Sequence, residues 1–175
     1  MEKVVIIPTG DEILQGIVLD TNSPALMGII LEKFPSARVE RATPVPDDPE
    51  AIKTALKQHS DYDLIIFIGG SGGGKCHDPD LAEDMTHPTL GALLSPKLEK
   101  KIYGYNGHLW SCLMVGRWNG KALVANVPGP YVEAVAAGKA LIAAIAKGRE
   151  LEETSERIAQ AVLAQYPSGS GLRYI

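Results

Sequence analysis

The sequence predicts an α/β fold: a three-layer α/β/α sandwich with a mainly parallel sheet and an added antiparallel hairpin. Short apolar runs typical of buried strands alternate with segments whose apolar residues recur at helical spacing. This alternation favours parallel strands that are covered by helices on both faces. Asn119-Gly120 lies between two further apolar runs, and this dipeptide predicts a hairpin because both of its residues tolerate positive φ.

Two proline-bearing motifs mark helix starts in the first half of the chain. Asn22 or Ser23 can cap a helix that has Pro24 in its first turn, where proline is tolerated. Asp48-Pro49 repeats this signal at the start of the next helix. The strands expected around these helices are residues 4–7, 37–43 and 64–68, the second of them more exposed.

The second half is expected to place the hairpin between helices. The basic cluster Lys97-Leu-Glu-Lys-Lys101 is interpreted as the solvated face of a helix, because its charges would be hydrated there. The expected elements are an interrupted helix over 79–94, hairpin strands over 109–118 and 121–127, an Ala-rich helix from 132 to about 147, and a terminal helix over 150–165 followed by a loose tail.

Composition predicts one soluble domain. The chain has 175 residues, 45% of them apolar, and a chain of this length buries roughly 70% of its unfolded surface without disulfides. We expect a domain over residues 1–148, with a C-terminal helix and tail over 149–175. The formal net charge of −4 argues against nucleic-acid binding. We find neither a signal-peptide pattern nor an apolar stretch long enough to span a membrane, so a cytoplasmic protein is expected.

Two glycine-bearing loops are the strongest candidates for a binding site. One runs from Thr9 to Gly16 and the other from Gly69 to Gly74, and each follows a predicted buried strand. Ligands of open α/β sheets bind beyond the carboxyl ends of the strands, and successive glycine N–H groups can form a nest for an anion. We therefore expect one shared pocket for a phosphorylated or oxyanionic ligand. The alternative for the second loop is a tight turn with no ligand.

Carboxylates near both loops suggest a further role for this pocket. Asp11 and Glu12 could accept hydrogen bonds from the N–H groups of a heterocycle or hold a divalent cation. They could also simply cap their own loop. Asp48 is expected to cap the next helix, which leaves Asp47 freer to face the pocket.

Several other reactive side chains are given structural interpretations. Cys76 and His77 have no partners at zinc-ligand spacing, so a bound transition metal is disfavoured. We find no nucleophile elbow that would indicate a Ser-His-Asp triad. His108 and Trp110 are expected to be surface or packing residues rather than ligand contacts.

The motifs also occur in the order of a known family. They are Thr9-Gly-Asp-Glu-Ile-Leu14 with Gly16, Asp20-Thr-Asn22, Val45-Pro-Asp-Asp48 before a helix, Asp63-Leu-Ile-Ile-Phe-Ile-Gly-Gly-Ser-Gly72, and Asp78. In spacing and order, residues 3–146 resemble the molybdopterin-binding domain family. That family includes adenylyltransferase and molybdate-inserting enzymes of molybdenum-cofactor biosynthesis, and the N-terminal domain of competence-damage-inducible proteins. The turn Pro128-Gly-Pro130 departs from the Pro-Gly-Asn-Pro turn usual in the molybdate-inserting members.

The resemblance implies that molybdopterin or its precursor binds across the strand ends. Gly70, Ser71 and Gly72 would cradle its terminal phosphate, while Asp11 and Glu12 would contact the pterin or an associated cation. The set implied to bind the cofactor is Thr9, Gly10, Asp11, Glu12, Asn22, Gly69, Gly70, Ser71, Gly72 and Gly73.

The resemblance also implies a reaction. Asp47 or Asp48, together with Asp78, would hold Mg²⁺ or molybdate; all three are the expected catalytic residues, with Asp48 and Asp78 as metal ligands. The implied reaction is adenylyl transfer or molybdate insertion, with ATP or molybdate as the second substrate. A non-catalytic molybdopterin carrier and a nucleotide-pyrophosphate hydrolase like the competence-related relatives stay open as alternatives. A homo-oligomer, with a trimer favoured, and a molybdoenzyme partner are further implications.

Overall fold

The computed structural model describes residues 1–74, 83–105, 107–166 and 173–175 of the chain. Its strands are β1 (Lys3–Pro8), β2 (Arg38–Arg41), β3 (Leu64–Ile68), β4 (Lys97–Tyr103), β5 (Leu109–Trp118), β6 (Ala122–Val127) and β7 (Arg173–Tyr174). They form one sheet in the order β2-β1-β3-β6-β5-β4-β7. The neighbours from β2 to β6 are parallel and those from β6 to β7 are antiparallel, so the predicted mainly parallel sheet with an antiparallel addition is confirmed.

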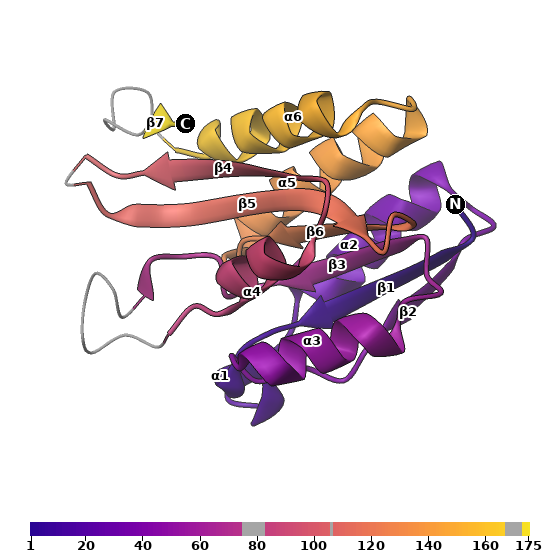
Figure 1. The fold of residues 1–175 in the computed structure, drawn as a ribbon, viewed down its shortest axis with the longest axis horizontal. Helices are drawn as coiled ribbons and strands as arrows, with labels where there is room; N and C mark the ends of the chain where they lie inside the picture. The colour runs from indigo at the N-terminus through magenta and orange to yellow at the C-terminus, as the bar shows by residue number, and fades with distance from the viewer. Residues whose placement is uncertain (75–82, 106, 167–172) are drawn as a thin grey trace.

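Helices cover both faces of this sheet (Figure 1). They are α1 (Asp11–Leu14), α2 (Asn22–Lys33), α3 (Pro49–Gln58), α4 (Thr86–Leu93), α5 (Tyr131–Ala146) and α6 (Leu151–Leu163). One buried cluster joins α2, α5 and α6 to the sheet, and the other joins α3 and α4 to its opposite face. The three-layer α/β/α architecture is therefore confirmed.

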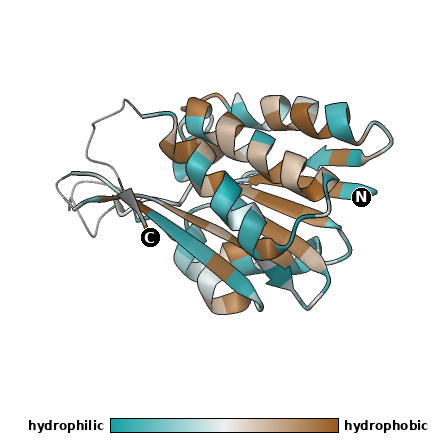
Figure 2. Ribbon diagram, turned by 90° about the horizontal axis from the view of Figure 1, so that it is seen from above, coloured by the Kyte–Doolittle hydropathy of each residue, from teal (hydrophilic) through white to brown (hydrophobic). Residues whose placement is uncertain are grey.

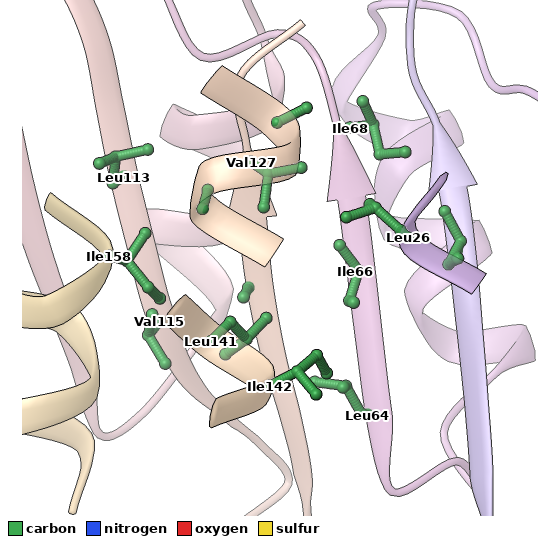
Figure 3. Packing of buried hydrophobic residues seen from close by; sticks show 14 of the residues in the cluster. Leu26, Leu64, Ile66, Ile68, Leu113, Val115, Val127, Leu141, Ile142 and Ile158 are labelled. Carbon is green, nitrogen blue, oxygen red and sulfur yellow. The ribbon is translucent and has the colours of Figure 1, made fainter. Parts of the chain in front are cut away.

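The larger core lies between α5 and the middle of the sheet. Leu141 and Ile142 of α5 pack over β3 and β6, while Ile158 of α6 lies beside Leu113 and Val115 of β5 (Figure 3). Figure 2 shows the central strands as largely hydrophobic and the helices as mixed. Strands buried on both faces read as continuous apolar runs, which explains why β1 and β3 were predictable from sequence.

Two local predictions are confirmed, one by backbone dihedral angles and one by a side-chain hydrogen bond. Asn119 and Gly120, which join β5 to β6, have φ of 51° and 68°, as a type I′ hairpin turn requires. Asp48 caps α3, because its Oδ1 accepts a hydrogen bond from the Ala51 N–H at 2.8 Å. The start of α2 differs from the prediction: Asp20, rather than Asn22 or Ser23, supplies the capping oxygen and accepts the Ser23 N–H at 2.9 Å.

Three other predictions are wrong. The cluster from Lys97 is not a helix face but the strand β4, because the ten-residue strand β5 offers it a hydrogen-bonding edge. Of the helix expected over 79–94, with interruptions at Pro88 and Gly91, residues 79–82 lie outside the described residues. In the described part, helix α4 begins at Thr86 and continues through Pro88 and Gly91; Pro88 lies in the first turn, where its missing N–H breaks no helical bond. Residues 167–172 of the expected loose tail lie outside the described residues, but Arg173 and Tyr174 are not loose, since they form β7 and pair with β4.

The arrangement of the parallel strands positions the candidate site. Pro8 at the end of β1 pairs with Ile68 of β3, which in turn pairs with Val127 of β6. Because these strands run in the same direction, the loops that follow them leave from one edge of the sheet. Ligands of open α/β sheets bind at such an edge.

Candidate functional site

A cavity of about 860 Å³ opens where the loops after β1, β3 and β6 meet. Its floor is the glycine loop, which we define as Gly69 to Gly74. Thr9 directly follows β1, Glu12 lies in α1, and Asn22 is the first residue of α2. Asp47 comes from the segment before α3. The two glycine-bearing loops therefore share one pocket.

The first two residues of the glycine loop could not carry a side chain. Gly69 and Gly70 have φ of 98° and 57°, a region that L residues rarely adopt. A Cβ on Gly69 would lie 2.8 Å from the carbonyl oxygen of Thr9, and one on Gly70 would lie 2.8 Å from Oδ1 of Asp47. Glycine at these positions lets the backbone pass close to its neighbours.

Several backbone groups of the glycine loop are already paired. The N–H of Gly69 donates to Val127, that of Gly73 donates to Leu109 at 2.9 Å, and that of Gly72 is hydrogen-bonded to the Asp84 carboxylate. Among the residues that the structure describes, the N–H groups of Gly70 and Ser71 have no hydrogen-bond partner. Two adjacent N–H donors at the floor of a cavity are suited to the oxygens of an anion.

The glycine loop is docked on β5 where β5 and β6 separate. Pairing of these two strands stops at Val115, and beyond it the N–H of Cys112 donates to the Ser71 carbonyl at 2.7 Å. The side chain of Asn126 spans the gap: its Oδ1 accepts the Met114 N–H at 2.6 Å, and its Nδ2 donates to the Cys112 carbonyl at 2.8 Å. The buried amide thus replaces sheet hydrogen bonds and leaves room for the loop.

The beginning of α4 holds the other side of the loop. The backbone N–H of His87 donates to the Gly70 carbonyl at 3.1 Å, and its ring Nε2 lies 3.2 Å from the Gly72 carbonyl. Burial lowers the pKa of His87. A neutral ring that carries its hydrogen on Nε2 donates to that carbonyl and fixes the loop conformation.

Three carboxylates form one side of the cavity, which we call the acidic wall: Glu12, Asp47 and Asp84. Burial, followed by the charges of Asp84, Glu12 and Asp11, raises the pKa of Asp47 to about 6. Burial also raises the pKa of Asp84. The backbone N–H of Met85 is hydrogen-bonded to the Asp47 carboxylate. Among the described residues, Oδ1 of Asp47 is nevertheless buried without a hydrogen-bond partner, so one oxygen of this carboxylate is unsatisfied.

The structure brings most of the predicted site residues together. Those that line the cavity are Thr9, Glu12, Asn22, Asp47, Gly69, Gly70, Ser71, Gly72 and Gly73. Gly10, Asp11 and Asp48 are not among the lining residues, and the Asp48 carboxylate is engaged at the start of α3. Asp78 and its neighbours Cys76 and His77 lie outside the described residues. Within the described ranges, no three His, Cys, Asp or Glu side chains are grouped so as to hold a metal ion.

Sequence reasoning missed part of the cavity. His108 and Trp110, which were expected to be packing or surface residues, line it. Asp84, Glu133 and Tyr166 also line it and were not singled out. The period-two pattern of the strand that begins at Leu109 could have indicated that Trp110 and Cys112 share a face, but not that the glycine loop lies against this end.

Solved structures of similar fold include proteins named for molybdopterin biosynthesis and a CinA protein. The molybdopterin biosynthesis enzyme MoaB from Thermus thermophilus is 22% identical, with a TM-score of 0.59, over 86% of this chain and 99% of its own. MogA is 20% identical, with a TM-score of 0.60, over 90% of this chain and 99% of its own. The protein CinA from Thermoplasma acidophilum is 20% identical, with a TM-score of 0.55, over 84% of this chain and 97% of its own. At these identities the similarity shows a shared fold.

The similar curated sequences are mostly CinA-like. A CinA-like protein from Anaeromyxobacter dehalogenans (strain 2CP-1) is 35% identical over 99 residues, which is 56% of this chain and 22% of that protein. Protein PYRAB15930 from Pyrococcus abyssi is 33% identical over 97 residues, 55% of this chain and 36% of that protein. This chain therefore matches about a fifth to a third of these relatives' length.

Two findings bear on the class of protein. No helix in the described part of the chain is both long and apolar enough to cross a membrane. The family described as "Probable molybdopterin binding domain" matches residues 5–147, which contain both glycine-bearing loops and the acidic wall. The chain therefore belongs to the molybdopterin-binding domain family.

Proposed function

We propose that the protein binds molybdopterin or its phosphorylated precursor in this cavity and acts on it in molybdenum-cofactor biosynthesis. The observation that carries the proposal is the pair of N–H groups of Gly70 and Ser71, which have no hydrogen-bond partner among the described residues and lie at the carboxyl edge of the sheet beside the acidic wall. An anionic phosphate would satisfy both donors. Membership of the molybdopterin-binding family supports a phosphorylated pterin as the ligand.

Mg²⁺ fits this site as an ion that binds together with the phosphate of the ligand. Mg²⁺ usually takes one or two carboxylates, ligand phosphates and several waters, so a grouped set of three protein ligands is not required. The orphaned Oδ1 of Asp47 is the described atom best suited to it. Asp78, outside the described residues, is the second ligand that we propose, and we assign Asp47 rather than Asp48 to the cation because only Asp47 lines the cavity. When bound, the ion supplies neutralisation of phosphate charge.

The reaction that we propose is adenylyl transfer to the bound pterin or insertion of molybdate into it. In such reactions the protein mainly positions groups and stabilises charge. Gly70 and Ser71 would hold the phosphate, Asp47 would hold its oxygens through the cation, and the cavity walls would limit access of water. The names of the similar structures, among them the molybdopterin biosynthesis enzyme MoaB, support this choice.

Calorimetric titration with molybdopterin, with and without Mg²⁺ and ATP, tests the proposal when it is followed by product analysis. Binding with an adenylylated or molybdenum-containing product is expected. Gly70→Ala should abolish binding, because its Cβ would crowd the side chains of Thr86 and Asp47 and the positive φ would be strained. Gly28→Ala on α2 is the matched control, since its Cβ would meet nothing within 4 Å. Failure of the wild-type protein to bind molybdopterin would refute the function, and binding without product would favour a carrier.

A second candidate function is hydrolysis of a nucleotide pyrophosphate. It is favoured by the CinA-like names of most of the similar curated proteins. The same glycine loop and acidic wall could bind a pyrophosphate together with Mg²⁺. Release of AMP from ADP-ribose by the wild-type protein, together with its loss in Asp47→Asn, would support this function; no release would exclude it for this substrate.

A further inference from the structure

Another part of the cavity lining is mainly aromatic rather than acidic. We call it the aromatic wall and define it as Trp110, Tyr131, Glu133 and Tyr166, all of which line the cavity. Trp110 comes from β5, Tyr131 and Glu133 come from the first turn of α5, and Tyr166 follows the end of α6. Three elements that are distant in sequence thus present aromatic surface and one carboxylate to the same space.

The indole of Trp110 is held in place but not covered. Its ring meets that of Tyr166 edge to face, with centroids 4.9 Å apart and an interplanar angle of 66°. The backbone of Gly104 packs against it, since a Cβ on Gly104 would lie 3.0 Å from Cε2 of Trp110. Even so, 43% of Trp110 remains exposed. A fixed, partly exposed indole at a cavity is suited to stacking with a flat ring.

Glu133 adds a polar group beside this aromatic surface. Its Oε1 accepts a hydrogen bond from the Tyr166 hydroxyl at 2.6 Å, and only 9% of the residue is exposed. Its second carboxylate oxygen has no hydrogen-bond partner in the described part of the chain. A carboxylate that is oriented in this way can accept the N–H of a heterocycle that stacks on Trp110.

Part of the aromatic wall comes from outside the family domain. The family match ends at residue 147, whereas Tyr166 follows α6. The packing of α6 on α5 and the sheet places Tyr166 beside Trp110 and Glu133. The C-terminal segment of this chain therefore completes one wall of the pocket.

We propose that the aromatic wall is the subsite for a planar heteroaromatic ring, which stacks on Trp110 and donates an N–H to Glu133. This inference rests on the proposed function in one respect: the ring belongs to the same ligand whose phosphate occupies the glycine loop. The acidic wall is less suited to the ring, because its members Glu12, Asp47 and Asp84 offer carboxylates and no aromatic surface. The ring is therefore assigned to Trp110 and Glu133 rather than to Asp11 and Glu12.

Ligand fragments can test the ring subsite separately from the phosphate site at the glycine loop. The ring probes are a phosphate-free pterin and adenosine, and the phosphate probe is inorganic pyrophosphate with Mg²⁺. The chain has two tryptophans, so Trp118→Phe leaves Trp110 as the single tryptophan fluorophore. In that background, a bound ring should quench the fluorescence. Trp110→Ala should weaken ring binding about tenfold by calorimetry, the range expected for loss of one stacking partner, while leaving pyrophosphate binding unchanged.

Two further variants make the outcome independent of one substitution. Glu133→Gln should weaken ring binding severalfold, whereas Trp110→Phe should retain most of it because a smaller ring remains; thermal melts check that each variant folds. Whichever of the pterin and adenosine binds more tightly is the ring that the subsite serves. A preference for either one supports the ring subsite. If pyrophosphate does not bind but the ring probes do, the phosphate site at the glycine loop is overturned and the ring subsite is not. No ring binding, or equal ring binding by wild type, Trp110→Ala and Glu133→Gln, would overturn the ring subsite.

Discussion

The hydroxyl of Thr86 at the start of α4 donates a hydrogen bond of 3.0 Å to the hydroxyl of Thr9 at the end of β1. Both residues are buried, and Thr9 in turn donates to the carbonyl of Ile68 at 2.9 Å. A short chain of hydrogen bonds therefore joins α4, β1 and β3 directly beneath Gly70, whose missing side chain makes room for Thr86.

Thr86→Val should destabilise the protein and weaken its binding of pyrophosphate. The substitution keeps the shape of the side chain but removes the donor to Thr9, so a loss of about 1 kcal/mol in the free energy of unfolding is expected. Urea unfolding and calorimetry would measure both effects. Thr89→Val on the same helix is the matched control: in the described part of the chain its Oγ1 is buried without a partner, so its removal should be neutral or stabilising. Equal effects of the two variants would contradict the importance of the Thr86 hydrogen bond.

Asp47 should make the unliganded protein less stable as the pH rises. Its pKa is raised from 3.8 to about 6, so the folded state disfavours the ionised form. The resulting penalty is absent below pH 3.8, grows as pH rises toward 6, and is constant above that. Asp47→Asn should remove this penalty, with a gain on the order of 1 kcal/mol at pH 7 after allowance for solvent screening. Denaturation at several pH values measures the difference.

The same titration should govern cation binding. In the presence of pyrophosphate, the affinity of the wild-type protein for Mg²⁺ should fall as pH is lowered through about 6, because protonated Asp47 is a poor ligand. Asp47→Asn should bind Mg²⁺ weakly at every pH. Asp61→Asn is the control, since Asp61 lies on the surface in an ion pair with Lys3. A wild-type Mg²⁺ affinity that does not change between pH 5 and pH 7 would remove Asp47 from the cation site.

Two substitutions at Asp48 separate its capping role from a metal role. Asp48→Ala should cost about 1 kcal/mol of stability, because α3 loses the side chain that accepts the Ala51 N–H. Asp48→Ser retains a capping oxygen but has no carboxylate, so its stability should be near that of the wild type. Both variants should bind Mg²⁺ with pyrophosphate normally, because Asp48 does not line the cavity. Loss of Mg²⁺ binding in Asp48→Ser would restore Asp48 as a metal ligand.

Asn126→Asp should disturb both stability and the glycine loop. The aspartate still accepts from Met114 but cannot donate to the Cys112 carbonyl, which would be left facing a carboxylate. A loss of about 3 kcal/mol is expected for a buried group in this position. Because Cys112 also holds the Ser71 carbonyl, pyrophosphate binding should weaken as well. The control is Asn119→Asp in the exposed hairpin turn, which tolerates aspartate; wild-type binding by Asn126→Asp would show that the loop does not depend on this bridge.

Local signals were sufficient for most of the fold. The apolar runs at β1 and β3, the cap and proline at the start of α3, and the Asn119-Gly120 turn act within a few residues, and each was predictable. Strand β4 was not, because Lys97 to Tyr103 has no strong pattern of its own and becomes a strand through its pairing with β5. The strand at β7 likewise depends on a distant partner, β4.

By itself the sequence determined the layered α/β fold and the glycine loop with Asp47 near it, because periodicity, capping and glycine conformation are local properties. Only the tertiary structure decided which other side chains share the cavity. Asp84 and His87 reach the loop because α4 begins beside it, and Trp110 reaches it because β5 separates from β6 at Asn126. Tyr166 reaches it because α6 packs back on the sheet. These contacts join residues far apart in the chain, and such contacts depend on packing that no local pattern encodes.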